Sequence, residues 1–201
     1  NRPMNAAYLY PYFFSDSSES IFTVPDVTMP PNLGSVAYRK PGFGLQLLRE
    51  QVLGPERFDA AFSYYVHKWA FKHPSPWDFF HCMENYSGET LDWFWRGWFM
   101  HQWKIDQAVD DVSYVDNDPS QGAIISISNL QKLPMPVTIE VKESNGKTGR
   151  VQLPVEIWQH GGQWKFIYHS DSKIDDVIID PDHKLPDSNP ANNSLKQVKG
   201  F

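Results

Sequence analysis

The chain has 201 residues, of which 41% are hydrophobic and 15% aromatic, so it is long enough and apolar enough to bury a substantial core. Its formal net charge is -6 at pH 7. Binding to nucleic acid requires a basic face, so this charge argues against a nucleic-acid partner. No apolar run approaches the roughly 20 residues of a membrane-spanning helix, so no membrane segment is predicted.

The only cysteine, Cys82, excludes an internal disulfide. It lies in an apolar helical stretch, which favours a buried side chain over a reactive thiol. The sequence contains no G-x-S-x-G motif and no phosphate-binding glycine loop, so it gives no support to a serine hydrolase or a nucleotide-binding protein.

Residues 1–37 have no clear period, and the first predicted helix covers residues 43–53. Gly54 is a plausible end for it, and Pro55 is suited to the first turn of a second helix over 55–71. Ser75 and Asp78 have the spacing of a capping box at the start of a third helix. A fourth helix is predicted over 89–102, where apolar residues occur on almost every side, which is typical of a buried helix.

From residue 123 onwards the hydrophobic period becomes two, as in β-strands. The alternating segments centre on residues 125–127, 137–141, 151–157, 164–168 and 177–179. Asn145-Gly146 and Gly161-Gly162 suit hairpin turns between them. The pattern predicts an α+β fold, with a helical domain over 1–115, a small antiparallel β-sandwich over 120–182 and a loosely held polar tail over 183–201.

One segment combines an expected extended stretch, Ser35-Val36-Ala37, with Tyr38, a turn at Lys40-Pro41-Gly42 and a following helix. It resembles the Tyr-x-Lys-Gly stretch of the aminopeptidase N and leukotriene hydrolase family of zinc metallopeptidases, the gluzincins. The resemblance implies a catalytic role for Tyr38, whose hydroxyl would donate a hydrogen bond to the oxyanion formed when zinc-bound water attacks a peptide carbonyl.

The similarity continues along the helices. In order, it runs through Leu53-Gly54-Pro55, Pro76-Trp77-Asp78-Phe79-Phe80, Ser87-Gly88 and Leu91-Asp92-Trp93-Phe94. In that family the corresponding helices form the end of a thermolysin-like catalytic domain, and a small β-sandwich commonly follows. Two departures stand out: Arg39 replaces an acidic residue of the family pattern, and Pro41 is additional.

The chain has no H-E-x-x-H motif, and none of its seven histidines has a partner four residues away. We therefore expect no metal ligand and no cofactor-binding residue in this chain. The resemblance implies that zinc, if bound, is held by the upstream half of the same catalytic domain, and that the chain alone is inactive.

Two other clusters have alternative interpretations. Trp93, Trp95, Trp98 and Trp103 could form a carbohydrate platform, but helical spacing in an apolar context favours core packing. Asp106, Asp110 and Asp111 could suggest calcium, but they lack the order of a calcium loop, which favours a solvated turn.

The resulting hypothesis is a C-terminal fragment of a zinc-dependent aminopeptidase that hydrolyses peptide bonds in peptide substrates. The fragment would contribute the oxyanion-stabilising Tyr38 and one wall of the cleft. The alternative is a non-catalytic helical-plus-sandwich module for protein interaction, or a family member without zinc. The family has cytosolic, periplasmic and surface members, so the location stays open, with a periplasmic or secreted protein favoured.

Overall fold

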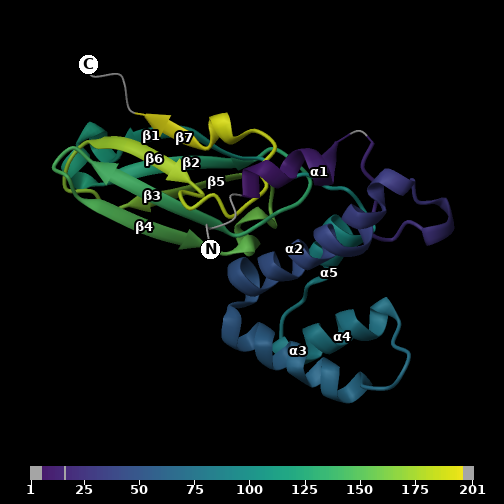
Figure 1. Ribbon diagram of the computed structural model, residues 1–201. Helices are drawn as coiled ribbons and strands as arrows, with labels where there is room; N and C mark the ends of the chain where they lie inside the picture. Colours follow the sequence, from purple (N-terminus) through teal and green to yellow (C-terminus); the bar gives the residue numbers. More distant parts are fainter. Residues whose placement is uncertain (1–5, 16, 197–201) are drawn as a thin grey trace. The chain divides into compact units, whose positions relative to one another are not determined.

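The computed structural model describes residues 6–15 and 17–196, and it shows the predicted α+β fold (Figure 1). The chain forms two compact units. The helical unit is Pro11–Trp103, and the sandwich unit combines Asn1–Tyr10 with Lys104–Phe201. Each unit has its own core and is described separately below.

The helical unit begins with α1, Tyr10–Phe14, whose first residue belongs to the other unit. Two 3-10 turns follow, Pro25–Val27 and Pro30–Asn32. A continuous helical run then comprises a π-helix Ser35–Arg39, α2 Lys40–Leu47 and a second π-helix Leu48–Leu53. The remaining helices are α3 Pro55–Trp69, α4 Pro76–Ser87, and α5 Asp92–Phe94, which continues as a π-helix over Trp95–Met100.

The ends of these helices follow the predicted chemistry. Gly54 has φ 80°, which ends one helix, and Pro55 begins α3. At α4 the backbone N–H of Asp78 donates to Ser75 Oγ (3.3 Å), and the backbone N–H of Ser75 donates to Asp78 Oδ2 (2.8 Å). Gly88, with φ 73°, closes α4 in the left-handed conformation. The capping box therefore forms as the sequence predicts.

The segment around Tyr38 differs from the prediction. The expected extended stretch and the Lys40-Pro41-Gly42 turn are wrong, because both lie inside the continuous helical run. Pro41 is an interior residue of this run, where a proline lacks the N–H for a helical hydrogen bond and its ring crowds the carbonyl four residues earlier. Upstream of it the backbone N–H of Lys40 bonds Ser35 O, the wider spacing of a π-turn. We attribute the π-helix to Pro41, whose ring crowds the preceding turn.

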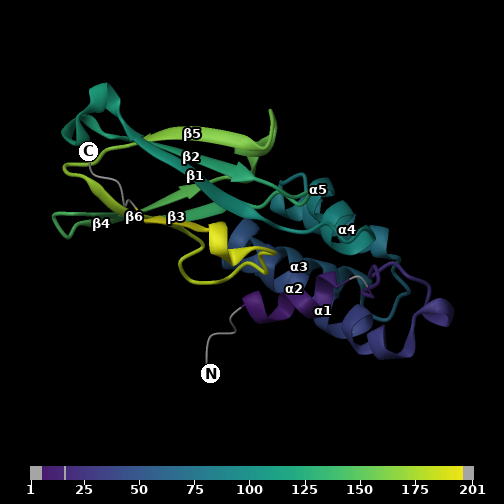
Figure 2. The same ribbon diagram turned by 90° about the horizontal axis from the view of Figure 1, so that it is seen from above.

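The core of the helical unit is aromatic. Trp95 and Trp98 are buried, and the Trp95 ring stacks on Phe80 with centroids 4.4 Å apart. Helices α3 and α4 lie side by side (Figures 1 and 2), and the Phe79 ring meets Tyr65 edge-on at 4.9 Å. Cys82 is buried, as predicted. Within the described part of the chain, no helix combines the length and the apolarity needed to cross a membrane.

The sandwich unit consists of two antiparallel sheets, which Figure 2 shows as two layers. One has the order β1-β2-β5, with β1 Gln107–Tyr114, β2 Ala123–Asn129 and β5 Gln163–Tyr168. The other has the order β4-β3-β6-β7, with β4 Thr148–Leu153, β3 Val137–Glu143, β6 Ile174–Ile179 and β7 Ser194–Lys196. Alternate side chains of both sheets form the shared core: Val109, Val112, Ala123, Ile125, Ile127, Val137, Ile139, Val141, Ile174, Val177 and Ile179.

Two elements of the sandwich differ from the expected strands. Strand β1 was not predicted, because a bulge between Val109 and Asp111 breaks its alternation and leaves two consecutive acidic residues exposed. The prediction that a strand continues through residues 155–157 is wrong. Pro154 precedes a 3-10 helix there, Val155–Trp158, and the Trp158 Nε1–H donates to Met135 O (2.9 Å).

The C-terminal segment is held by buried contacts, although we expected a loosely held tail from residue 183. Leu185 and Asp187 are buried, and β7 pairs with β6. The Asp187 carboxylate accepts the backbone N–H groups of Gln107 (2.9 Å) and Asn189 (2.7 Å). Burial raises the pKa of Asp187 to about 6. The part of the expected tail over 197–201 lies outside the described residues.

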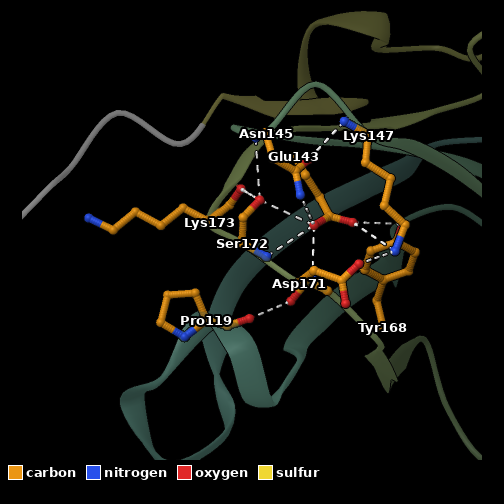
Figure 3. Close-up of polar contacts among 9 residues, drawn as sticks. Pro119, Glu143, Asn145, Lys147, Tyr168, Asp171, Ser172 and Lys173 are labelled. Atoms are coloured by element: carbon orange, nitrogen blue, oxygen red, sulfur yellow. Dashed lines mark hydrogen bonds and ion pairs between the residues drawn. The ribbon is translucent and has the colours of Figure 1, made fainter.

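A buried carboxylate joins the β3–β4 hairpin to the connection between β5 and β6 (Figure 3). The Glu143 side chain is fully buried, and Figure 3 shows the contacts of its carboxylate. Its Oε2 accepts the backbone N–H groups of Asp171 (2.9 Å) and Ser172 (3.1 Å), and Lys147 Nζ lies 3.8 Å from Oε1. The β5–β6 connection leads from one sheet to the other, so Glu143 fixes the point at which the chain changes sheets.

We expect Glu143→Gln to lower the free energy of unfolding of the sandwich unit by about 2–4 kcal/mol, because the amide loses one acceptor oxygen and places a donor near Lys147. Chemical denaturation of both proteins measures this. Glu140→Gln on the same strand is the matched control: its ion pairs with Arg150 (3.3 Å) and Lys142 (3.5 Å) lie at the surface. That control should cost less than about 1 kcal/mol. Equal losses in the two variants would contradict the role given to Glu143.

Candidate functional site

Tyr38, the predicted catalytic residue, lies in the π-helix Ser35–Arg39 and is 77% exposed. The neighbouring side chains differ in exposure. Val36 and Lys40 are buried, with 6% and 1% exposure, whereas Arg39 is exposed. Within residues 6–15 and 17–196 no group hydrogen-bonds the Tyr38 hydroxyl. The helix therefore presents a phenol to the surroundings with its O–H available as a donor.

The opposite side of this helix is buried at Lys40. Its ammonium nitrogen lies 5.1 Å from the centre of the Phe14 ring and 5.9 Å from that of Trp98. No hydrogen-bond acceptor among the described residues reaches this nitrogen. Burial lowers the pKa of Lys40 to about 8. The backbone carbonyl of the same residue accepts the Trp98 Nε1–H at 2.9 Å.

A crevice lies beside Lys40, but it is too tight to hold a water molecule. Part of its wall is the Glu19 carboxylate, which accepts the side-chain N–H of Asn32 (2.7 Å) and the backbone N–H of Met29 (3.1 Å). Because the crevice has no room for a ligand, we interpret it as packing, and the exposed side of the helix at Tyr38 remains the candidate site.

The described residues include side chains of the types that can bind a metal ion. Across the described ranges, no group of three or more His, Cys, Asp or Glu side chains is arranged to hold a metal ion. The described residues therefore do not by themselves form a site that fits a zinc ion.

The two other predicted clusters have separate outcomes. Trp95 and Trp98 belong to the core, as predicted, whereas Trp93 and Trp103 are only half-buried. The solvated turn expected at Asp106, Asp110 and Asp111 is wrong, because Asp110 and Asp111 lie on β1 and Asp106 is buried just before it. Asp106 Oδ1 accepts the side-chain N–H of Asn192 (2.8 Å), an anchor for the C-terminal segment.

The contacts that hold the helix carrying Tyr38 in place were not predicted from the sequence. They depend on Trp98, Lys40 and Gly44, where a Cβ would lie only 2.2 Å from Trp98 Nε1. A glycine inside a helical pattern is a signal of close approach by another group, so Gly44 could have suggested a packed partner. Nothing in the pattern identifies that partner as Trp98, which is 54 residues further along the chain and belongs to another helix.

No protein-family model matches the chain, and a search of curated proteins finds no match. Among solved structures, the chain is similar to Legionella pneumophila aminopeptidase A, determined in complex with aspartic acid, with a TM-score of 0.55 and 15% identity. The match covers 76% of this chain and 17% of that protein. At this identity the likeness shows a shared fold.

The buried amine generates a prediction about stability. We expect Lys40→Met to raise the free energy of unfolding of the helical unit at pH 7 by up to about 3 kcal/mol, because Met occupies the same space without a charge. The folded-state pKa lies below the ordinary value, so the wild-type protein should gain stability as the pH rises from about 8 towards 10.5, and the variant should lack this gain.

Denaturant titrations of the helical unit's transition at pH 7 and pH 10 measure both effects. Lys68→Met is the control, since Lys68 is exposed on α3. A Lys40→Met protein that is less stable than wild type at both pH values would show that the amine has a partner essential to the fold.

Proposed function

We propose that this chain is part of a zinc-dependent peptidase, with an aminopeptidase activity, in which Tyr38 donates a hydrogen bond to the reacting carbonyl oxygen. The observation that carries the proposal is the position of Tyr38: an exposed phenol on a helix whose opposite side is buried against Trp98. The likeness of the fold to an aminopeptidase supports the reaction class.

The chemistry requires a neutral donor at a fixed place. A phenol stays protonated at neutral pH, so it can donate to an oxyanion without itself carrying a charge. When water attacks a peptide carbonyl, negative charge develops on its oxygen, and one preorganised donor at that oxygen stabilises the transition state by about 2.7–4 kcal/mol. A π-turn favours such a role, because π-helical turns often occur at functional sites.

The proposal assigns the zinc ion and its ligands to a part of the protein outside this chain. The motivation is the coverage of the comparison, in which the chain corresponds to 17% of the aminopeptidase, together with the absence of a metal cluster from the described residues. A purified sample of this chain alone should therefore contain no stoichiometric zinc, whereas the native-length protein should, and elemental analysis of both samples distinguishes them.

The surface of the helical unit supports a large covering partner. Exposed large apolar side chains cluster in this unit by sequence: Tyr12, Phe22, Val24, Val27, Met29, Leu33, Tyr38, Phe62, Tyr64, Val66, Phe71, Trp77 and Tyr86. The sandwich unit has fewer, namely Leu130, Trp164 and Ile167. In the proposal, the upstream half of the catalytic domain covers part of the helical unit, and peptide substrate binds next to Tyr38.

The same exposed side chains support the second candidate, a non-catalytic protein-interaction module. Apolar surface of this kind marks an interface, whatever the chemistry of the protein. The reading frame of the native protein separates the two: a helix with H-E-x-x-H before Tyr38 supports the peptidase, and its absence supports the module.

We expect Tyr38→Phe in the native-length protein to lower kcat about 100–1000-fold with a much smaller change in KM, because the lost hydrogen bond forms in the transition state. Hydrolysis of aminoacyl p-nitroanilides measures both constants. Tyr86→Phe is the matched control, another exposed tyrosine of the helical unit, and should retain kcat within about twofold. A Tyr38→Phe enzyme with near-normal kcat would refute the assignment.

A further inference from the structure

The helix that carries Tyr38 is held at its buried side by one indole ring. Trp98 is fully buried, and its Nε1–H donates to the backbone carbonyl of Lys40 at 2.9 Å. A carbonyl oxygen has two lone pairs, so it can accept this bond in addition to a helical one. The hydrogen bond therefore ties Trp98 to the backbone two residues after Tyr38, at the junction between the π-helix and α2.

The ring also lies directly against the helix one turn further on. A Cβ at Gly44 would lie 2.2 Å from Trp98 Nε1 and 2.4 Å from its Cδ1. Residues Lys40 and Gly44 are four apart and share one face of α2. The indole thus contacts the same face at two successive turns, which fixes both the rotation of the helix about its axis and its distance from Trp98.

Other rings hold the indole in turn. Its centre lies 5.9 Å from the Phe13 ring, 5.7 Å from the Phe14 ring and 5.9 Å from the Phe43 ring. Phe13 and Phe14 are buried, so Trp98 has no room to move away from the helix. The position of the helix is therefore defined by a rigid neighbour rather than by a surface contact.

Tyr38 and Lys40 are two residues apart on a helix, so their side chains lie on nearly opposite sides. Their exposures of 77% and 1% agree with this. We propose that Trp98 is a positioning residue for Tyr38: by holding Lys40 O and filling the space above Gly44, it fixes the direction in which the phenol projects. This inference rests on the proposed function, because it specifies how the donor reaches a defined place.

The test is a double-mutant cycle in the native-length protein with p-nitroanilide substrates. Trp98→Phe retains a buried ring and removes the N–H that binds Lys40 O. We expect it to lower kcat about 10–100-fold with KM within about threefold, since small displacements of a catalytic group have effects of this size. In the Tyr38→Phe background the same substitution should change kcat less than twofold, because the donor that it positions is absent.

Trp95→Phe is the matched control. Trp95 is buried in the same helical turn, but its Nε1 has no hydrogen-bond partner among the described residues. We expect Trp95→Phe to reduce thermal stability about as much as Trp98→Phe does, and to leave kcat within about twofold of the wild-type value. Replacement of Trp98 by β-(3-benzothienyl)alanine, which has the same shape without the N–H, serves as a second variant if Trp98→Phe does not fold.

The outcomes separate the two hypotheses. If Tyr38→Phe lowers kcat but the Trp98 variants do not, or if they lower kcat equally in the Tyr38→Phe background, the positioning role is overturned and the proposed function stands. If Tyr38→Phe leaves kcat unchanged, the proposed function fails and the positioning role fails with it. If Tyr38→Phe lowers kcat, and the Trp98 variants lower kcat only when Tyr38 is present, the results support both the proposed function and the positioning role.

Discussion

The helical unit depends on the contact between an indole ring and a helix that has no side chain at the point of contact. A glycine inside a helix costs roughly 0.5–1 kcal/mol relative to alanine. A buried aromatic side chain removes about 150–250 Å² from water, at about 25 cal/mol per Å², so its burial outweighs that cost several-fold. Gly44 is therefore stabilising in its context, because any larger residue would displace Trp98 from the core. The same displacement would break the bond to Lys40 O and release the turn that carries Tyr38.

In the sandwich unit, a buried carboxylate fixes the position of a connecting loop. Its apolar core holds the two sheets together, but hydrophobic attraction has no direction and does not fix where a connecting loop lies. Glu143 supplies the direction, since its carboxylate accepts backbone N–H groups from Asp171 and Ser172. Burying a carboxylate without such donors would cost several kcal/mol, so each donor is essential to the loop. Polar contacts thus specify the connections, and apolar contacts specify the layers.

The sequence predicts the features whose causes are local. The capping box at Ser75 and Asp78, the helix end at Gly88 and the alternation within β3 depend on neighbouring residues, and they appear as expected. The failures have non-local or competing causes. The turn expected at Pro41 is helical because the φ of proline suits a helix as well as a turn, and tertiary packing by Trp98 favours the helix. The hydrophobic pattern does not predict strand β1, because its bulge leaves two consecutive acidic residues exposed and breaks the alternation. For the candidate site, the pattern around Tyr38 singles out the residue, while its exposure and its anchor can come only from the structure.

The exposed apolar side chains of the helical unit constrain any function that is assigned to it. Val27 is 69% exposed and Phe71 is fully exposed, and each would release about 1.5–3 kcal/mol on complete burial. Burial of several such residues in an interface would provide a substantial free energy of association. The sandwich unit, by contrast, buries most of its apolar residues in its own core. Both proposed functions use that free energy, the peptidase for the rest of its catalytic domain and the module for a partner protein. Only the peptidase also requires the phenol of Tyr38 to be held in a fixed direction. A docking surface also gains from a helix that Trp98 holds in place, because preorganisation lowers the entropic cost of binding, so the fixed helix is compatible with both proposals.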